Sequence, residues 1–269
     1  MKWLGDVAFG VGMVIFRGHA GDNRIHRHWA HQIVIGLNGE FELEGSDGLV
    51  RAEAAVIFSG APHRLLPSKV LSIYLDPVND IFQRLFTTAP EITTAQSITS
   101  KPPTEEIACL RKQELAPLCR LIASSATLDD LLVAIQTEFL NPASDSENRL
   151  AMVLARLNKA ESEAHSEAKE LSKHGIDRHE IGRNDLAKLL NLSPTRFSHW
   201  FREQTGVPLR SYKKWLKLRN GIDFVFAGQS LVEASLAAGF TDQAHFSRSF
   251  SQAFGITLTD AVEATGPII

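Results

Sequence analysis

Apolar residues recur with two different periods along this chain of 269 residues, and the change of period divides it. Up to about residue 75, short runs rich in β-branched and aromatic residues are separated by glycines, which is typical of strands. From about residue 81 onward, apolar residues recur three and four positions apart, which is typical of amphipathic helices. The pattern predicts the α+β class, with a β-rich part followed by a helical part.

The β-rich part contains five predicted strands, at residues 11–16, 32–37, 40–44, 49–58 and 70–75. Asn38 and Gly39 stand between the second and the third strand. This dipeptide favours a two-residue hairpin, so we expect those two strands to pair. Many short strands with such turns are typical of a small β-barrel or sandwich.

The middle of the chain is predicted to be helical. A helix over residues 107–124 should bend or begin afresh near Pro117, and Thr127 with Asp130 predicts the capped start of the next helix. The apolar side chains of that helix share one face, which could pair two subunits or pack on the strands. Residues 147–173 carry an apolar residue every seven positions, which is typical of either a connecting helix or a second self-association seam.

Residues 185–205 predict two short helices joined by a tight turn. Ser193 and Pro194 supply an N-cap hydroxyl and a fixed φ, so a second helix starts only a few residues after the first ends. Its predicted inner face consists of Phe197, Trp200 and Phe201. Two helices joined by a tight turn form the helix-turn-helix arrangement.

A long predicted helix over residues 209–226 leads to a repeat of this arrangement. Ser230 with Glu233 three positions later is a capping box, and Gly239 marks the turn. The last helix has a predicted inner face of Phe246, Phe250 and Phe254, which recur every four residues.

These features resemble the DNA-binding domain of AraC/XylS-type transcription regulators. The resemblance rests on Leu186, Ala187, Ser193, residues 197–202, Gly206, Gly239, Phe240, Asp242, residues 246–248, Phe250, Phe254 and Gly255. It implies two recognition helices held about one turn of DNA apart. The outward residues that the resemblance makes DNA-reading are Thr195, Arg196, Ser198, His199, Arg202, Gln243, Ala244, His245 and Arg248.

Charge is distributed unevenly along the chain. The formal net charge of −3 gives no general attraction to DNA, so affinity for phosphates requires a local excess of basic residues. Between residues 183 and 219, nine lysines and arginines stand against two acidic residues. This local excess favours nucleic acid as the partner of the helical part.

The two cysteines and the N-terminal segment indicate the compartment. Cys109 and Cys119 are too few for a disulfide framework, and we interpret them as buried thiols in a helical region of a protein from a reducing compartment. The N-terminus lacks a signal-peptide pattern, and no apolar stretch reaches the roughly 20 residues that span a bilayer. We therefore expect a cytoplasmic, nucleoid-associated protein with no membrane partner.

The β-rich part also carries grouped histidines. His26 and His28 are two apart, so both rings would face one side of a strand, and His63 follows Gly60. This spacing resembles the two motifs of the cupin family, with Gln32 where metal-binding cupins place glutamate. The side chains expected to converge on an effector pocket at the barrel mouth are His26, His28, Gln32 and His63.

The same cluster raises the question of a cofactor. Three imidazoles suit a transition metal, but the missing carboxylate favours an organic ligand, so no cofactor is predicted. A metal held by His26, His28 and His63 is the alternative. Because imidazole titrates near neutral pH, we expect binding at this pocket to weaken as the pH falls towards about 5.5.

These expectations define three regions: a cupin-like β-barrel sensor at residues 1–90, a helical dimerisation or linker region at 91–175, and an AraC-type DNA-binding domain at 176–269. The leading hypothesis is a transcription regulator, not an enzyme, that binds double-stranded DNA under the control of a small-molecule effector. The resemblance adds a homodimer partner and, for an activator, RNA polymerase. The alternative is a metal-dependent cupin enzyme, or a ligand-binding protein, with an accessory DNA-binding module.

Overall fold

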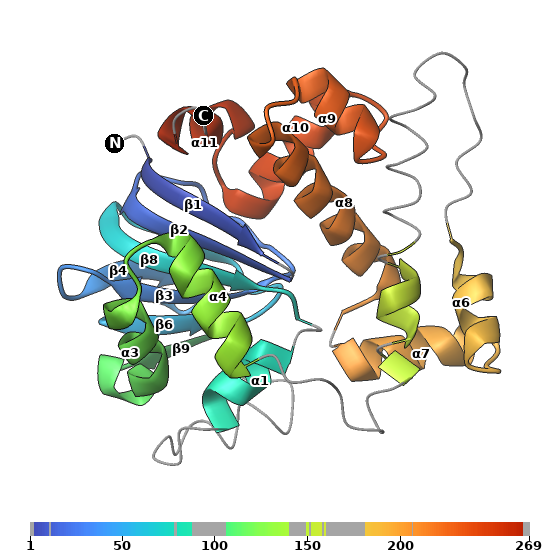
Figure 1. The fold of residues 1–269 in the computed structure, drawn as a ribbon, viewed down its shortest axis with the longest axis horizontal. Coiled ribbons are helices and arrows are strands. Elements are labelled where there is room, and N and C mark those ends of the chain that lie inside the picture. Colours follow the sequence, from blue (N-terminus) through green and yellow to red (C-terminus); the bar gives the residue numbers. More distant parts are fainter. Residues whose placement is uncertain are drawn as a thin grey trace. The chain divides into compact units, whose positions relative to one another are not determined.

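The computed structural model describes residues 3–10, 12–77, 80–87, 106–139, 149–150, 152–157, 159, 181–205 and 207–265. The chain divides into two compact units, Met1–Asn141 with Ser247–Ile269 and Pro142–Phe246. All the described strands lie in the first unit, and the regular elements described in the second are helices (Figure 1). The expected α+β class, with a β-rich N-terminal part and a helical C-terminal part, is confirmed.

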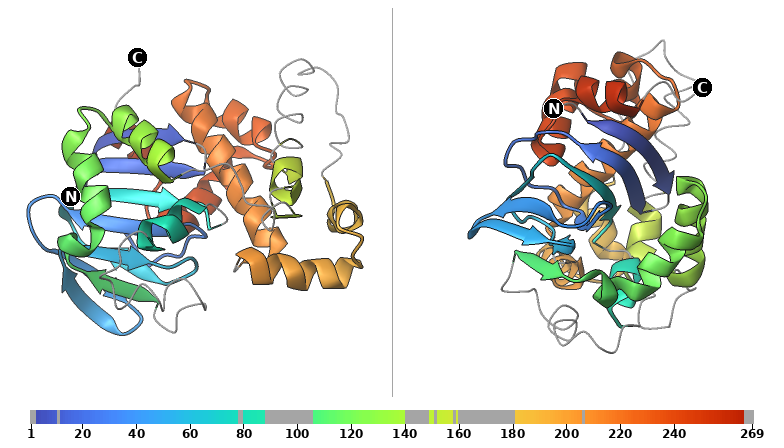
Figure 2. Two further views of the ribbon diagram at one scale, coloured as in Figure 1. Left: turned by 60° about the horizontal axis from the view of Figure 1, so that its bottom comes forward. Right: turned by 90° about the vertical axis from the view of Figure 1, so that its left-hand side faces the viewer.

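Antiparallel pairing joins the nine described strands into two sheets (Figure 2). The larger sheet contains, in spatial order, β1 (Leu4–Gly10), β2 (Met13–Ala20), β8 (Ser68–Leu75), β3 (His31–Gly36), β6 (Ala54–Ile57) and β9 (Ile107–Leu110). The smaller sheet contains β5 (Gly48–Ala52), β4 (Phe41–Gly45) and β7 (His63–Leu65).

Both faces of the larger sheet are covered, which explains why its central strands are apolar at nearly every position. Successive residues of a strand point to opposite faces, so Ile33 belongs to one core and Val34 to the other. The core that contains Val34 also takes Leu43 from β4, and therefore fills the space between the sheets. The core that contains Ile33 lies on the other face, beneath the helices of this unit.

Four short helical elements contribute to the core on the helical face: α1 (Asp80–Thr87), the 3-10 helix η1 (Lys112–Leu115), α3 (Ala116–Ser124) and α4 (Leu128–Phe139). The apolar face predicted on α4 is buried here through Leu131 and Ile135. This face packs on the core of its own unit, which is one of the two expected alternatives, and pairing of two subunits through the helical region stays a prediction. The predicted cap is confirmed, because the Asp130 N–H donates to Thr127 Oγ1 over 3.0 Å.

Three local predictions in this unit are wrong, each because a distant partner decides the structure. Residues 107–110 form strand β9 rather than helix, since β6 offers them a free edge to pair with. The predicted strand over 49–58 is two strands, β5 and β6, which belong to different sheets. The residues beside Asn38 and Gly39 do not form a hairpin: β3 and β4 lie in different sheets, and Gly39 turns the chain between them with a φ of 115°.

The helical C-terminal part follows the predicted order. Its elements are α6 (Arg183–Leu189), α7 (Pro194–Thr205), α8 (Leu209–Phe226), α9 (Leu231–Ala237), α10 (Gln243–Phe254) and α11 (Leu258–Thr265). Asn191, with a φ of 52°, makes the turn between α6 and α7, since asparagine tolerates the left-handed region better than most residues. The capping box of α9 is confirmed, because the Glu233 N–H donates to Ser230 Oγ over 3.2 Å and the Ser230 N–H donates to Glu233 Oε2 over 3.1 Å.

Some predictions fall outside the described residues. The helix expected over 147–173 is described only at 149–150, 152–157 and 159, which are helical, and Gly206 is not described. Among the described helices, none combines the length and the apolar character needed to cross a bilayer.

Candidate functional site

The first predicted recognition helix is α7, and its inward and outward faces lie as the sequence indicates. The Phe197 and Phe201 rings are completely buried, and Trp200 is half-buried. Four of the outward side chains are exposed: Thr195, Arg196, His199 and Arg202. Ser198 is only partly exposed, because its hydroxyl donates to the Pro194 carbonyl over 3.0 Å.

The second predicted recognition helix is α10. Its N-terminus is capped by Asp242, whose Oδ1 accepts from the His245 N–H over 2.6 Å. Its exposed side chains are Gln243, Ala244, His245 and Arg248. Phe246 and Phe250 are buried as predicted, whereas Phe254 is only half-buried.

A basic groove of about 920 Å³ lies in the second unit. It is lined by Arg183, Ser198, His199, Arg202, Pro208, Leu209, Arg210, Lys213, Lys214, Lys217, Gly239, Phe240 and His245. The groove therefore brings together four predicted DNA-reading residues, from α7 and from the start of α10, with five further lysines and arginines. The described lining includes no carboxylate to neutralise them, so the groove attracts polyanions.

Two groove lysines are held by backbone carbonyls. Lys213 Nζ donates to the Ile181 carbonyl over 2.7 Å, and Lys217 Nζ lies 3.5 Å from the Gly239 carbonyl. The set of DNA-reading residues predicted from the sequence omitted these lysines and Arg210, although the charge pattern between residues 183 and 219 had already marked them. The other five residues of that set lie outside the lining, on exposed positions of the two helices: Thr195, Arg196, Gln243, Ala244 and Arg248.

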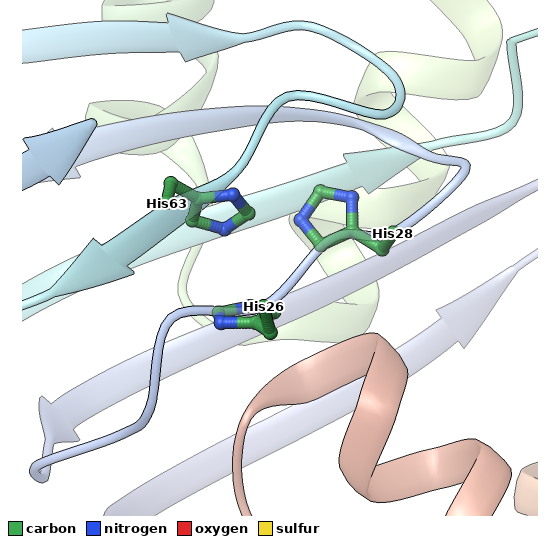
Figure 3. A group of neighbouring side chains, drawn as sticks. All are labelled: His26, His28 and His63. Atoms are coloured by element: carbon green, nitrogen blue, oxygen red, sulfur yellow. The ribbon is translucent and has the colours of Figure 1, made fainter. Parts of the chain in front are cut away.

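The first unit contains the histidine cluster, which we define as His26, His28 and His63 (Figure 3). One ring nitrogen from each histidine lies within 4.8 Å of the others. Gln32, on β3, adjoins the cluster through a contact of 2.9 Å with His28 Nε2. The structure thus brings together the four side chains expected to converge. They are buried rather than open at a barrel mouth, with exposures of 7% for His26, 2% for His28 and Gln32, and 1% for His63.

Strand alternation, from which the convergence was predicted, does not produce it. His26 and His28 do not share a regular strand, because both lie in the connection between β2 and β3. His26 is instead held by an isolated antiparallel bridge to His63, in which the backbone N–H of each residue donates to the carbonyl of the other over 3.0 Å. This bridge places the rings side by side.

Backbone carbonyls fix the orientation of all three rings. Nδ1 of His26 lies 2.9 Å from the Arg24 carbonyl, Nδ1 of His28 lies 2.8 Å from the Ala30 carbonyl, and Nδ1 of His63 lies 3.0 Å from the Ala61 carbonyl. A carbonyl only accepts, so each Nδ1 carries the proton and donates it. Each neutral ring then has its lone pair on Nε2.

The orientation of the Gln32 amide follows from this tautomer. Its oxygen is placed 2.9 Å from His28 Nε2, and its nitrogen 3.3 Å from both Ser72 Oγ and the Tyr74 hydroxyl. A neutral His28 cannot donate from both nitrogens, so we assign the amide the reverse orientation, which has the same shape. The amide nitrogen then donates to Nε2, and the amide oxygen accepts from the two hydroxyls.

Burial keeps the cluster uncharged. Loss of hydration lowers the pKa of His26 to about 4, and the nearby His28 ring lowers it further. The same loss of hydration lowers the pKa of His28 and carries that of His63 well below its ordinary value. The titration expected near about 5.5 is therefore displaced towards more acidic pH, and the rings are neutral at pH 7.

The cluster is also joined to the C-terminal segment of its own unit. The Arg24 carbonyl that accepts from His26 belongs to a residue whose N–H donates to the Gly255 carbonyl over 3.1 Å. The Tyr74 ring, beside Gln32, packs edge-on against Phe254 with the ring centroids 5.6 Å apart. No local pattern in the sequence predicts these contacts, because they link residues more than 150 positions apart.

Comparison with known families places the helical part. A family model described as a helix-turn-helix domain matches residues 186–264. The C-terminal part of the chain therefore contains a helix-turn-helix domain. Its two helix-turn-helix motifs are α6 with α7 and α9 with α10, as the sequence predicted.

Solved structures of ToxT from Vibrio cholerae share the fold along nearly the whole chain. An apo ToxT variant is 9% identical, with a TM-score of 0.53, and the match covers 96% of this chain and 99% of that one. A second ToxT structure is 10% identical, with a TM-score of 0.51 and the same coverage. A third holds (E)-4-(8-methylnaphthalen-1-yl)but-3-enoic acid; it is 9% identical, with a TM-score of 0.50, and the match covers 95% of this chain and all of that one.

Proposed function

We propose that this protein is a sequence-specific DNA-binding transcription regulator of the AraC type, controlled by a small ligand held in its N-terminal unit. The observation that carries the proposal is the basic groove, which lies beside exposed residues of both helix-turn-helix motifs. A chain of net charge −3 that concentrates six lysines and arginines in one groove is suited to bind the phosphate backbone locally.

Affinity and specificity have different sources in this proposal. Cationic side chains of α8, such as Arg210 and Lys214, neutralise phosphates and position the protein on the duplex. The exposed faces of α7 and α10 read base edges in the major groove, where Arg196 and Arg248 could grip guanine with two hydrogen bonds. The two helices would read half-sites about one helical turn apart.

The ligand is assigned to the histidine cluster and Gln32. One ToxT structure holds an aryl-substituted butenoic acid, so a protein with this fold accepts a small organic acid. In the present chain the cluster offers uncharged donors and acceptors in the interior of the first unit. A ligand shifts a regulatory equilibrium only through contacts that differ between two states, and the cluster's links to Gly255 and Phe254 supply contacts that could differ.

The decisive experiment measures duplex binding as a function of salt. Arg210 and Lys214 are exposed groove residues of α8, and replacing both by alanine should lower affinity for all duplexes alike. The slope of log K against log salt should become shallower by about 0.9 for each phosphate that the variant no longer neutralises. Arg120→Ala is the matched control, since this arginine is exposed on α3, in the other unit. An unchanged slope in the double variant would contradict the proposal.

Three further expectations stay predictions. The chain is expected to lack enzymatic activity, to form a homodimer, and to contact RNA polymerase if it activates transcription. The rival function, a metal-dependent enzyme, draws on the histidine cluster alone, which among the described residues includes no carboxylate that could act as a general base. The salt experiment is independent of these expectations, because it concerns only the groove.

A further inference from the structure

We propose that His26, His28 and His63 bind one divalent first-row transition-metal ion, with Zn²⁺ as the representative, through their three Nε2 atoms. The remaining coordination position would take an anionic group of the effector. The metal site stands on the geometry of the cluster alone. Binding of an anionic effector to the metal extends the proposed function and rests on it.

The hydrogen bonds of the three rings already match those of metal-binding histidines. Such histidines donate their other ring N–H to a carbonyl or carboxylate, which fixes the ring and makes the ligating nitrogen more basic. All three Nδ1 atoms lie within 2.8 to 3.0 Å of a backbone carbonyl. Three rings with the same tautomer therefore present their lone pairs from Nε2.

The spacing requires only a small contraction. Zinc–nitrogen bonds of about 2.0–2.1 Å in a tetrahedral site place the ligand nitrogens about 3.4 Å apart. One ring nitrogen of each histidine, either Nδ1 or Nε2, lies within 4.8 Å of the others, so a contraction of roughly 1.4 Å at most brings such a set to this spacing. His26 and His28 belong to a connection between strands rather than to a regular strand, so ring rotation and a small backbone shift can supply this movement.

One ring nitrogen of the histidine cluster has no hydrogen-bond partner among the described residues. This atom is Nε2 of His63, which is fully buried. A buried acceptor left unpaired costs stability, so a histidine that served only for packing would normally be paired at both nitrogens. Coordination of a metal would satisfy this nitrogen. His28 Nε2 would exchange its contact with Gln32 for the metal, which frees the Gln32 amide for whatever occupies the open position.

Charge balance identifies the class of effector. Three neutral imidazoles and a neutral amide leave both positive charges of the ion uncompensated in a buried place, which is costly. An anionic ligand on the metal removes most of this cost, whereas a neutral ligand does not. The site therefore favours a carboxylate or a comparable anion over a sugar or an amine.

The test uses untagged full-length protein, stripped of metal and titrated with Zn²⁺ in a calorimeter. The wild type should bind one equivalent, and His63→Gln should bind at least about 100-fold more weakly, beyond the roughly 10–100-fold that removing a hydrogen-bond partner of a ligand costs. His19→Gln is the control, because His19 is a histidine of the same unit outside the cluster, and it should match the wild type. Equal binding by His63→Gln and wild type would overturn the metal site.

Co²⁺ supplies a readout that does not depend on the folding of a variant. The wild-type Co²⁺ complex should show the strong visible absorption of a four-coordinate ion, and acetate, as a carboxylate probe, should shift that spectrum. A weak octahedral spectrum would overturn the site, and a spectrum unmoved by acetate would overturn the anionic effector while leaving the metal. Neither measurement involves DNA, so a failure of the proposed regulator function would leave both results unaffected.

Discussion

The basic groove and the histidine cluster use ionisable side chains in opposite ways. The groove keeps its arginines and lysines in contact with water, where their charge costs little and can attract a polyanion. The cluster removes three imidazoles from water, and burial keeps them neutral. The groove therefore offers positive charge to a polyanion, whereas the cluster offers the lone pairs of neutral imidazole rings.

This difference determines whether each site can be predicted from the sequence or only from the folded structure. A charged surface is visible in composition, because an excess of basic residues over a stretch of chain attracts phosphate whatever the exact fold. A buried polar cluster acts only when rings from distant positions meet at a fixed orientation. Substitutions in the groove should therefore change binding and leave folding alone, while changes in buried regions should act first on stability.

The largest effect should come from the core beneath the groove. Phe197→Ala removes a completely buried ring, whose centroid lies 5.8 Å from that of Trp200 and 6.0 Å from that of Phe201. The free energy of unfolding should therefore fall by about 3–5 kcal/mol. Arg196→Ala, the exposed neighbour on α7, should change it by less than about 0.5 kcal/mol. Urea denaturation measures both. Equal stability of the two variants would contradict the position of Phe197 in the core, and a larger loss for Arg196→Ala would mean that the two faces of α7 are exchanged.

Acid should act on the cluster and spare the groove. Burial lowers the pKa of His26 to about 4, whereas an unfolded histidine titrates near about 6.5. Between these values the unfolded chain binds more protons, so stability falls as the pH drops from 6.5 and levels off below about 4. The contribution of His26 is at most about 3 kcal/mol.

Thermal melts of metal-free protein between pH 7 and pH 4.5 check this expectation. His199→Gln, at an exposed position of α7, should shift with pH as the wild type does. A melting temperature that does not change over this range would show that the cluster is hydrated rather than buried.

A smaller effect should separate base reading from phosphate contact. Arg248 is exposed on α10, and Arg248→Ala should weaken binding to the specific site by about 1–3 kcal/mol if the side chain grips a base. Binding to an unrelated duplex should change much less. The comparison of the two duplexes decides the role, since an equal loss on both would assign Arg248 to phosphate.

The smallest effect concerns Asp223, a half-buried carboxylate of the second unit. Burial raises the pKa of Asp223 to about 6, against the opposing charge of Arg219, and its Oδ1 has no hydrogen-bond partner among the described residues. The folded state thus binds the proton more tightly than the unfolded state, and stability is lost as the pH rises from about 4 to about 6. Asp223→Asn should stabilise the protein by about 1–2 kcal/mol at pH 7.5 and flatten this pH dependence. A less stable variant would reveal a partner for the charged carboxylate.

The helical part could be predicted from the sequence because its signals are local. The capping box of Ser230 and Glu233, the start of α7 at Pro194 and the bounds of α8 all follow from residues within a few positions of one another. The β-rich part was predicted less well because pairing partners are distant. Strand β9 exists only because β6 offers it an edge, so the helix predicted over residues 107–110 was wrong.

In the candidate sites, too, the features with local sequence signals could be predicted and those that depend on distant contacts could not. The outward residues of α7 and α10 follow from helical periodicity, whereas only the folded structure brings Arg210 and His245 into the lining of one groove. The grouping of His26, His28 and His63 was expected from their spacing, but the bridge that creates it was not. Cys109 was expected to be buried in a helix; it is exposed on β9, because edge strands present alternate residues to water.

Whether this chain reads a specific DNA sequence through two helices can be decided by selecting genomic fragments on the purified protein and sequencing them. We expect a shared motif with two half-sites about 10 base pairs apart. Arg196→Ala should relax one half-site and Arg248→Ala the other. Fragments retained without any common motif, or a motif that neither substitution alters, would contradict sequence-specific reading by these helices.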